Sequence, residues 1–573
     1  MPVSNADIAR VFARYATLLE IQGANPFRVR AYRNAAQTLQ GLPRGAADML
    51  AAGEDLTELQ GIGTDLAGKI AEVVATGRLH QLDELERSMP PALVELTTLP
   101  GLGPKRVKLL HEALKTNTLE DLERAARAGH VRDVAGFGPK TEQKILDAIA
   151  KRRGRDARLP WIEAEVIAEP LLRALRDTPG VHEAAVAGSF RRRRETVGDL
   201  DIVVAARDGP AAMRRFVSYE DVADVVASGP TKATVRLRNG LQVDLRVVEQ
   251  PSYGAALLYF TGSKAHNIAL RARAIRGGLK LSEYGLFKGR RRVAGRSEQE
   301  VYRALRLPYI EPELREDRGE IAAAERGELP KLVELGDLRG DLHCHTSATD
   351  GRDTLEAMAR RAEELGYEYL AITDHTRRLR IARGLDRRQL ARQLAQIERL
   401  NAKLGRVRLL KSAEVDILED GSLDLPDDLL RELDVVVCAA HYKFDLSRKQ
   451  QTDRLVRAMD NRYCHILAHP TGRLLGEREP YDVDMERLMR AARSRGCFLE
   501  LNAQPQRLDL NEADCRMAKD LGVKLAISTD AHSTAQLEYM RLGVAQARRG
   551  WVEAADVVNT RRWSDVTRLL RRA

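Results

Sequence analysis

The segment Gly188-Ser189-Phe190-Arg191-Arg192 is followed a few residues later by Gly198-Asp199-Leu200-Asp201-Ile202, and together they indicate the chemistry of the central part of this chain. Two aspartates two positions apart on a strand point to the same face. Such carboxylates repel each other unless they share divalent cations. Asp244, in the apolar strand pattern Gln242–Val248, offers a third carboxylate. Together they predict a site for two Mg²⁺ or Mn²⁺ ions that supports in-line phosphoryl transfer.

A mixed helix and strand pattern surrounds this motif. A helix pattern covers Trp161–Arg176, and short β-branched runs follow at Glu183–Gly188, Asp201–Ala205, Ala233–Leu237 and Gln242–Val248. Residues 251–310 are expected to be mostly helix and turn, with a basic run at Lys288–Arg292. The pattern predicts an α+β domain. An isolated Asp-x-Asp is usually a solvated surface pair, so the Gly-Ser turn and Asp244 are what favour a catalytic interpretation.

Length and composition limit the class of protein. The 573 residues suffice for three or four domains, and 44% apolar with 31% charged residues is ordinary globular composition. This excludes a disordered, collagen-like or small disulfide-stapled protein. No apolar stretch approaches the ~18 residues of a membrane span, and Met1–Tyr15 predicts an amphipathic helix rather than a signal peptide. The five cysteines all follow residue 340, so we expect no disulfide framework and a cytoplasmic location.

The positive charge is confined to the first part of the chain. Residues 1–310 carry 48 Lys and Arg against 37 Asp and Glu, a net charge of +11. Residues 311–573 carry 45 against 46, a net charge of −1. Because such an excess is typical of a surface that meets phosphates, we expect nucleic acid to bind mainly to the N-terminal part.

Three glycine repeats occupy the first 155 residues, where helical patterns without strand-like alternation predict an all-α region. Leu59–Thr64, Leu99–Pro104 and Val134–Pro139 share the frame apolar-x-Gly-apolar-Gly, and a helix pattern follows each. The two glycines close a tight turn, and the free N–H groups of the next helix can hold a phosphate. This helix-hairpin-helix pattern binds the DNA backbone without reading its sequence; plain inter-helix turns are the alternative. The glycines expected to contact DNA are Gly61, Gly63, Gly101, Gly103, Gly136 and Gly138.

Beyond residue 337 the pattern alternates between strand and helix. Seven apolar strands are expected, at Gly340–His345, Tyr369–Asp374, Val407–Asp416, Asp434–His441, His465–His469, Phe498–Asn502 and Lys524–Asp530. Helix patterns separate most of them, which predicts a βα barrel with its active site at the carboxyl ends of the strands. The charged stretch Glu311–Asp337 before it is typical of a linker or crossing helix.

Histidines and acidic residues gather at these strand ends. Six of the seven histidines past residue 337 lie there with three acidic residues, and the set is His343, His345, Asp350, His375, Glu414, His441, His469, Asp530 and His532. A lone histidine at such a place is more often a hydrogen-bonded core residue. Nine converging ligands predict a metal site, and the histidines favour Mn²⁺ or Zn²⁺ over Mg²⁺.

The first motif is that of the nucleotidyltransferase superfamily, and Tyr259-Phe-Thr-Gly-Ser-Lys-Ala-His-Asn267 resembles the family X DNA polymerases in particular. The resemblance implies that Asp199, Asp201 and Asp244 are catalytic. It implies that Ser189 and Arg192 hold the triphosphate of a dNTP, that the Tyr-Phe-Thr-Gly segment packs against the sugar, and that Asn267 touches the incoming base. The implied nucleotide-binding residues are Gly188, Ser189, Arg192, Gly198, Tyr259, Phe260, Gly262 and Asn267. A helix-end core role is the alternative for Tyr259 and Phe260.

The C-terminal strand ends resemble the PHP phosphoesterase domain motif by motif. The resemblance implies a distorted seven-stranded barrel with up to three metal ions and 3′-5′ exonuclease or related phosphoesterase activity. One ion would be held by His343, His345, Glu414 and Asp530. Glu414 would bridge to a second ion with His441 and His469, and the third ion would be held by Asp350, His375 and His532.

The first module resembles the small N-terminal domain of DNA polymerase beta. Gly61–Lys69 and Phe27–Ala36 match it, and Lys69 stands where that domain has the lysine that forms a Schiff base with a deoxyribose phosphate. Asp65 replaces one supporting lysine, and Arg28 stands where another would be. The resemblance makes Lys69 a candidate lyase residue, with phosphate binding as the alternative.

The expected order is a lyase-like helix-hairpin-helix domain over residues 1–85, a second helix-hairpin-helix domain over 86–155, a nucleotidyltransferase palm over 156–250, a thumb over 251–315, a linker over 316–337 and the PHP barrel over 338–573. The whole resembles a bacterial or archaeal family X DNA polymerase with a PHP domain. We expect a monomer that fills short gaps in DNA repair, using gapped or primed DNA and dNTPs. The alternatives are a PHP nuclease whose polymerase half only binds DNA, and a non-catalytic repair scaffold.

Overall fold

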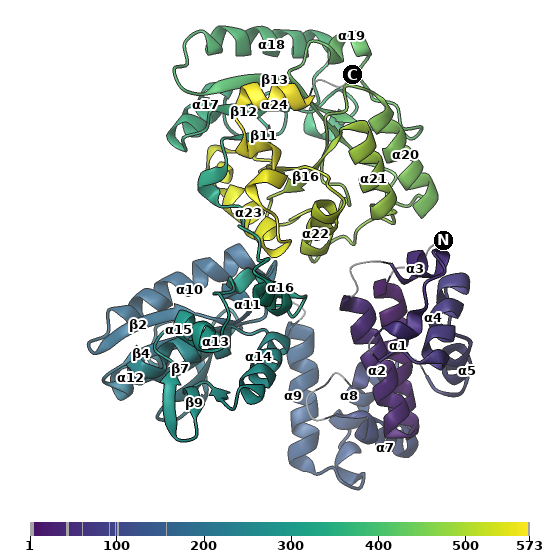
Figure 1. Cartoon of the computed structure of the whole chain (residues 1–573), viewed down its shortest axis with the longest axis vertical. Coiled ribbons are helices and arrows are strands. Elements are labelled where there is room, and N and C mark those ends of the chain that lie inside the picture. The colour runs from purple at the N-terminus through teal and green to yellow at the C-terminus, as the bar shows by residue number, and fades with distance from the viewer. Residues whose placement is uncertain are drawn as a thin grey trace. The chain divides into compact units, whose positions relative to one another are not determined.

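The computed structural model describes residues 5–41, 45–59, 61–90, 92–97, 99, 102–155 and 158–570. The chain forms two compact units, residues 1–157 and 158–573. Within its described residues the first unit is all helical, which confirms the expectation, and it has one continuous apolar core. Its helices are α1 (Asn5–Gln22), α2 (Pro26–Gly41), α3 (Ala46–Ala51), α4 (Thr64–Thr76), α5 (His80–Ser88), α6 (Leu93–Leu96), α7 (Pro104–Leu114), α8 (Leu119–Arg127) and α9 (Pro139–Arg155) (Figure 1).

Each glycine repeat leads into a helix. Gly63 caps α4, Gly103 caps α7, and Gly138 directly precedes α9. Gly61 and Gly136 have φ of +80° and +85°, which glycine adopts without a steric penalty. Gly101, the remaining glycine expected to contact DNA, lies outside the described residues.

A five-stranded sheet forms the beginning of the second unit. Its order is β2-β4-β7-β6-β5, in which β4 and β7 are parallel and the other pairs antiparallel. The strands are β2 (Val181–Val186), β4 (Asp199–Ala206), β5 (Val222–Ser228), β6 (Lys232–Leu237) and β7 (Gln242–Val248), and the helices packed on them are α10 (Trp161–Arg176), α12 (Gly209–Val217) and α13 (Tyr253–Thr261). Four of these strands were expected. Strand β5 was not, because it is exposed along nearly its whole length and carries no buried alternation.

The pleat of β4 decides which face carries the aspartates. Ile202 and Val204 pack with α10 and α12, whereas Val203 packs with α13 on the opposite face. Asp199 and Asp201 alternate in step with Val203, so they lie on the α13 face.

Helix α13 leads into a region that contains a small sheet. The elements are α14 (Lys264–Arg276), β8 (Lys280–Ser282), β9 (Gly285–Lys288), β10 (Arg291–Ala294) and α15 (Glu298–Ala304). The expectation of mostly helix and turn omitted these strands. They are short, and the basic run Lys288–Arg292 forms the turn of the β9–β10 hairpin, so no buried alternation marks them.

The segment expected as a linker contains α16 (Glu320–Arg326). The Glu320 carboxylate is fully buried and lies 2.6 Å from Nδ1 of His266, whose Nε2 lies 2.9 Å from the hydroxyl of Tyr302. Ala323 and Ala324 join the same apolar cluster as Leu270 of α14. This part of the segment is therefore packed into the preceding domain.

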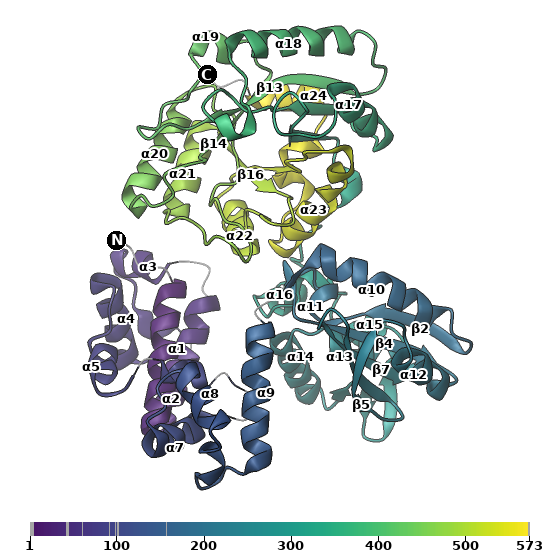
Figure 2. The same cartoon turned by 180° about the vertical axis from the view of Figure 1, so that it is seen from behind.

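Seven parallel strands form a nearly closed barrel in the order of the sequence (Figures 1 and 2). They are β11 (Gly340–Cys344), β12 (Tyr369–Ile372), β13 (Arg408–Asp416), β14 (Val435–Ala439), β15 (Ile466–Leu467), β16 (Phe498–Asn502) and β17 (Leu525–Ser528), which confirms the seven expected strands. A parallel bridge between Cys344 and Ala531 joins the segment that follows β17 to the end of β11.

Helices cover the outside of the barrel and close one end. The outer helices are α17 (Leu355–Glu364), α18 (Arg387–Asn401), α19 (Asp427–Leu430), α20 (Arg448–Asp460), α21 (Met485–Arg495), α22 (Glu512–Asp520) and α23 (Met540–Arg549). Val566 and Leu570 of α24 (Trp563–Leu570) join the interior cluster with Val435 and Phe498, which begin their strands. The carboxyl ends of the strands are left for the site.

All five cysteines are buried, and none of them is in a disulfide within the described part of the chain. None of the described helices combines the length and the low charge that crossing a bilayer requires.

Candidate active sites

Three carboxylates meet on one face of the five-stranded sheet. In the parallel register of β4 and β7, Asp201 lies beside Asp244 and Asp199 beside Gln242. Asp244 accepts hydrogen bonds from the Thr234 hydroxyl and from Nε2 of Gln242, the latter at 2.9 Å. Burial and the charges of Asp199 and Asp244 raise the pKa of Asp201 to about 7. Because divalent cations would relieve this repulsion, the donor set fits them.

The Gly-Ser turn approaches this face closely. It forms α11 (Gly188–Arg191), and the N–H of Ala187 donates to the carbonyl of Asp201 at 2.6 Å. A Cβ on Gly188 would lie 2.2 Å from Oδ2 of Asp201. The φ of Gly188 is +60°, which lies in the left-handed region. Only glycine fits here, because a side chain would occupy the space of the carboxylate. The turn carries Ser189 and Arg192 to the carboxylates.

A cavity of about 700 Å³ opens at this face. The expected residues that line it are Gly188, Ser189, Arg192, Asp199, Asp201, Tyr259, Phe260, Gly262 and Asn267. Asp244 and Gly198 do not line it, but each adjoins a residue that does. Four further cations line the cavity and were not singled out from the sequence: Arg158, Arg194, Lys264 and Arg271. Carboxylates beside several cations fit a polyphosphate bound through divalent ions.

Arg192 is held in this cavity by two oxygen acceptors. Its Nε donates to Oε1 of Glu316 at 3.0 Å, and its Nη1 donates to the carbonyl of Thr261 at 2.5 Å. A Cβ on Gly262 would lie 3.2 Å from that Nη1, so glycine permits the close approach. The amide of Asn267 donates to the carbonyl of Tyr259 at 2.6 Å, which fixes its orientation at the cavity wall.

Glu414 lies at the centre of the second cluster, inside the barrel. Its Oε1 is 3.0 Å from Nε2 of His469 and 3.2 Å from Nε2 of His441. Its Oε2 is 2.8 Å from Nδ1 of His375, and 3.5 and 3.6 Å from Nε2 of His343 and His345. One buried carboxylate therefore contacts five imidazoles from four strand ends.

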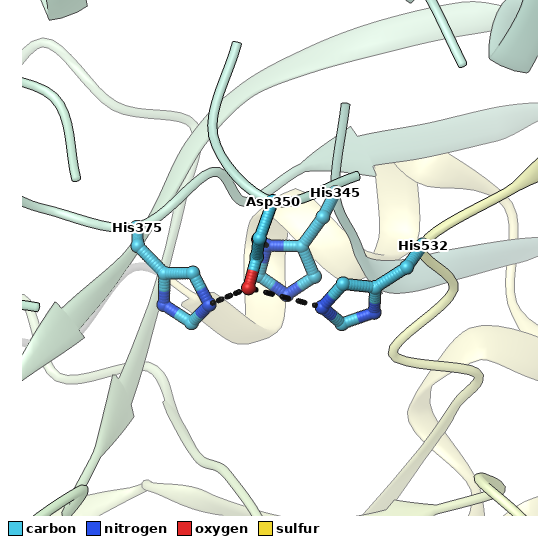
Figure 3. Close-up of side chains that lie close together, drawn as sticks. All are labelled: His345, Asp350, His375 and His532. Carbon is cyan, nitrogen blue, oxygen red and sulfur yellow. Dashed lines mark ion pairs between the residues drawn. The ribbon is translucent and has the colours of Figure 1, made fainter. Parts of the chain in front are cut away.

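Asp350 and Asp530 complete the cluster. Oδ2 of Asp350 lies 3.3 Å from Nε2 of His375 and 3.4 Å from Nε2 of His532, with the His345 ring beside them (Figure 3). Oδ1 of Asp530 lies 3.1 Å from Nε2 of His345. The nine residues expected from the sequence are thus brought together.

The chemistry of the cluster fits metal ions. Nδ1 of His345 and Oδ1 of Asp350 are buried and have no hydrogen-bond partner among the described residues. Burial alone would lower the pKa of His375, but Glu414 and Asp350 raise it to about 10. Burial and the neighbouring His375 lower the pKa of His345 to about 4. Imidazoles held this close, with unpaired buried donor atoms, are typical of a metal site.

Two carboxylates behind the proposed ligands were not expected from the sequence. Nδ1 of His343 lies 2.7 Å from Oε1 of Glu500, and Nδ1 of His441 lies 2.8 Å from Oδ1 of Asp416. Each carboxylate orients an imidazole so that its Nε2 faces the cluster. The available signal was an acidic residue inside a buried apolar strand, β16 and β13 respectively.

Lys69 lies in α4 with its side chain nearly buried. Its Nζ donates to Oδ2 of Asp65 at 2.5 Å and lies 5.5 Å from the ring centre of Tyr32. Burial would lower the pKa of Lys69, but Asp65 and Tyr32 raise it above its usual value. The ammonium form, which is not a nucleophile, is therefore favoured.

Family models match most of the chain. They are Helix-hairpin-helix domain (residues 3–79), SAM-like Helix-hairpin-helix tandem (93–151), DNA polymerase beta palm (158–244), DNA polymerase beta thumb (256–316) and PHP domain (341–504). The chain is 38% identical over 571 residues to the DNA polymerase/3'-5' exonuclease PolX of Bacillus subtilis, a match that covers 99% of each. This chain belongs to the family X DNA polymerases that carry a PHP domain.

Two further relatives match parts of this family X chain. DNA polymerase lambda of Rattus norvegicus is 27% identical over 341 residues, 54% of this chain and 56% of that one. A probable phosphatase of Thermoanaerobacter is 30% identical over 203 residues, 34% of this chain and 78% of that one. The expected fold class is confirmed: all-α helix-hairpin-helix domains, an α+β palm and thumb, and a seven-stranded PHP barrel. Family X polymerases and PHP domains are metal-dependent. The polymerase domains imply a DNA substrate.

Proposed function

We propose that this chain fills short gaps in DNA repair at its palm and removes 3′-terminal nucleotides at its barrel. The observation that carries the proposal is the presence of two separate ligand sets in one chain. Three carboxylates adjoin a cavity lined by cations, and nine histidines and carboxylates meet inside the barrel. The sets share no residue, so each supports its own reaction.

At the palm, Asp199, Asp201 and Asp244 would hold two Mg²⁺ or Mn²⁺ ions, which when bound neutralise charge on the transferred phosphoryl group. Arg192 and Ser189 bind the triphosphate of a dNTP, because a guanidinium and a hydroxyl donate strong hydrogen bonds to phosphate oxygens. Gly188 leaves room for the Asp201 carboxylate, and Gly198 permits the close approach of Arg158, which also lines the cavity.

The end of α13 shapes the sugar and base positions. The rings of Tyr259 and Phe260 pack edge to face with centroids 5.1 Å apart. The guanidiniums of Arg271 and Arg246 lie 5.9 and 5.1 Å from the Tyr259 and Phe260 ring centres. Rings held in this way would pack against the sugar and disfavour a ribose, and Asn267 would contact the base.

In the barrel, up to three Mn²⁺ or Zn²⁺ ions would activate water and stabilise the leaving oxygen of a phosphoester. Glu414 would bridge two of them, and the position of both of its oxygens next to imidazoles supports this role. Glu500 and Asp416 hold His343 and His441 in the tautomer that leaves Nε2 free. The proposed sets are His343, His345, Glu414 and Asp530; Glu414, His441 and His469; and Asp350, His375 and His532.

The partners follow from this chemistry. Gapped or primed DNA and dNTPs are the proposed substrates, and the enzyme is proposed to act as a monomer in the cytoplasm. A single assay tests the function: a one-nucleotide-gapped duplex with a labelled primer and Mg²⁺ or Mn²⁺, with and without dNTPs. Extension with dNTPs and shortening without them are expected. Shortening alone would identify a nuclease that only binds DNA through its polymerase half, and no change would identify a scaffold.

Backbone binding by the glycine turns gives a prediction about affinity. Lys105 is exposed in the first turn of α7, directly after Gly103, where a phosphate would meet the helix N-terminus. Lys105→Ala should weaken binding to gapped DNA several-fold and reduce the slope of log Kd against log salt by about one. Lys403→Ala, an exposed lysine of the barrel, is the control. An equal loss in the control would mean that DNA does not bind specifically at the turn.

The pairing of Lys69 with Asp65 gives a prediction about lyase chemistry. Asp65→Asn should lower the pKa of Lys69 and raise the yield of borohydride-trapped adduct with 5′-deoxyribose-phosphate DNA several-fold. Lys69→Ala should abolish the adduct, and Asp133→Asn, an exposed aspartate of the same unit, should leave it unchanged. Undiminished trapping by Lys69→Ala would show that another amine reacts.

A further inference from the structure

Helix α23 of the barrel places a buried arginine against the palm. The Arg549 side chain is 1% exposed, although its guanidinium is charged. Its Nη1 donates to the main-chain carbonyl of Arg192 at 2.7 Å, and its Nη2 lies 3.1 Å from Oε1 of Glu512 in α22. A buried charge of this kind is retained only where its partners are well placed.

Glu316 connects this arginine to the nucleotide cavity. Its Oε1 accepts from Nη1 of Arg549 at 3.1 Å and from Nε of Arg192 at 3.0 Å. The next cation is farther away, with Nη1 of Arg194 at 3.8 Å. Burial would raise the pKa of Glu316, but Arg192 and Arg549 hold it below its usual value. The carboxylate is thus ionised and shared between two guanidiniums.

The shared carboxylate competes with a triphosphate for Arg192. A phosphate oxygen and Glu316 would both draw on the donors of one guanidinium, so a tighter Arg192–Glu316 pair weakens phosphate binding. Arg549 opposes this in two ways. It pairs with Glu316 and so neutralises part of the carboxylate charge, and it holds the main chain of Arg192 at the end of the Gly-Ser turn.

We propose that Arg549 of the barrel is a positioning residue for dNTP binding in the palm, acting through Glu316 and the Arg192 carbonyl. The inference rests on the proposed function only in taking Arg192 as a triphosphate ligand. Glu512 anchors the arrangement from the barrel side, since Arg549, Arg318 and Arg194 overcome its burial and lower its pKa to about 2. The barrel therefore helps to position the nucleotide-binding residues of the palm, in addition to carrying out its own reaction.

Arg549→Met should raise the KM for dNTP about tenfold on gapped DNA, because a buried charge-assisted contact is lost. The kcat for extension and the rate of 3′-end cleavage should stay within about twofold of wild type. The Kd of a dNTP for the enzyme–gapped DNA complex, measured by calorimetry with Ca²⁺, should rise by the same factor. Arg549→Lys keeps the charge but loses one of the two guanidinium branches. Its dNTP KM and Kd should therefore lie between those of the wild type and those of Arg549→Met.

Arg541→Met is the matched control. Arg541 lies on the same helix and pairs with Glu165 of the palm at 2.5 Å, and no described contact joins it to Arg192 or Glu316. An equal rise in dNTP KM for both variants would mean that the interface is merely loosened, and would overturn the proposal. An unchanged KM and Kd in Arg549→Met would also overturn it.

Glu316→Gln provides an independent test. Removing the competing charge should lower the dNTP KM, and combining it with Arg549→Met should restore binding toward wild type. If Arg549→Met does not fold, the single Glu316→Gln variant tests the proposal. A dNTP KM that is raised or unchanged in Glu316→Gln contradicts it. A wild type that does not extend a primer would contradict the proposed function instead. The dNTP Kd of wild type and Arg549→Met, measured by calorimetry, would still test the role of Arg549.

Discussion

Asp201→Ala is expected to reduce primer extension on gapped DNA by about a thousandfold or more, because the carboxylate lies between Asp199 and Asp244 and its loss removes the support for the transition-state charge. The 3′-end cleavage of the same variant should be unchanged, since every residue of that cluster comes from the barrel. A labelled primer on a one-nucleotide gap, with and without dNTPs, measures both activities. Asp199→Ala should behave in the same way.

The matched control for this variant is Asp224→Ala. Asp224 lies in β5 of the same sheet but is exposed and pairs in register with Arg236 of β6. It should retain full extension. Near-normal extension by Asp201→Ala would remove the assignment of the polymerase site.

Glu414→Ala is expected to reduce 3′-end cleavage by about a thousandfold while primer extension is retained. The carboxylate contacts five imidazoles, so its loss leaves five histidines without their shared partner and removes the proposed bridge. Elemental analysis should find Mn, Zn or Fe at more than one equivalent in the wild type and less in Glu414→Ala. His343→Ala should lose cleavage as well.

Two controls separate loss of the cluster from general damage. Glu419→Ala removes an exposed glutamate just beyond β13 and should change neither activity nor metal content. His465→Ala removes a buried histidine just before β15, whose Nδ1 accepts from the N–H of Val436 at 3.0 Å at the end of the barrel opposite the cluster. It should keep its metal and its nuclease activity. A fully active Glu414→Ala, or a wild type without a tightly held transition metal, would overturn the metal-cluster assignment.

The elements that the sequence predicted best are those with a buried face. Gln242–Val248, Phe498–Asn502 and Trp161–Arg176 have the expected bounds in the structure, because a buried strand or helix face requires a regular apolar pattern. Strand β5 is exposed along nearly its whole length, and β8, β9 and β10 have only three or four residues each, so none of them left such a pattern. Their pairing depends on neighbouring strands rather than on their own residues.

The clustering of the two proposed ligand sets was predictable for a related reason. Carboxylates and histidines at strand ends are few and chemically specific, and the carboxyl ends of parallel strands meet at one place. Glu500 and Asp416 were missed because each hydrogen-bonds a ligand instead of being one. The raised pKa of Lys69 was missed because it depends on the depth at which its helix is packed and on Tyr32.

Local spacing and residue chemistry were enough to predict the domain types, the barrel strands and both proposed ligand sets. How these parts support each other depends on tertiary packing. Arg192 and Arg549 are 357 positions apart, yet they share one oxygen of Glu316. Such a contact depends on which helix of the barrel packs against the palm, and at which rotation. No local pattern records that choice, because packing between distant elements is fixed by the summed burial of both surfaces.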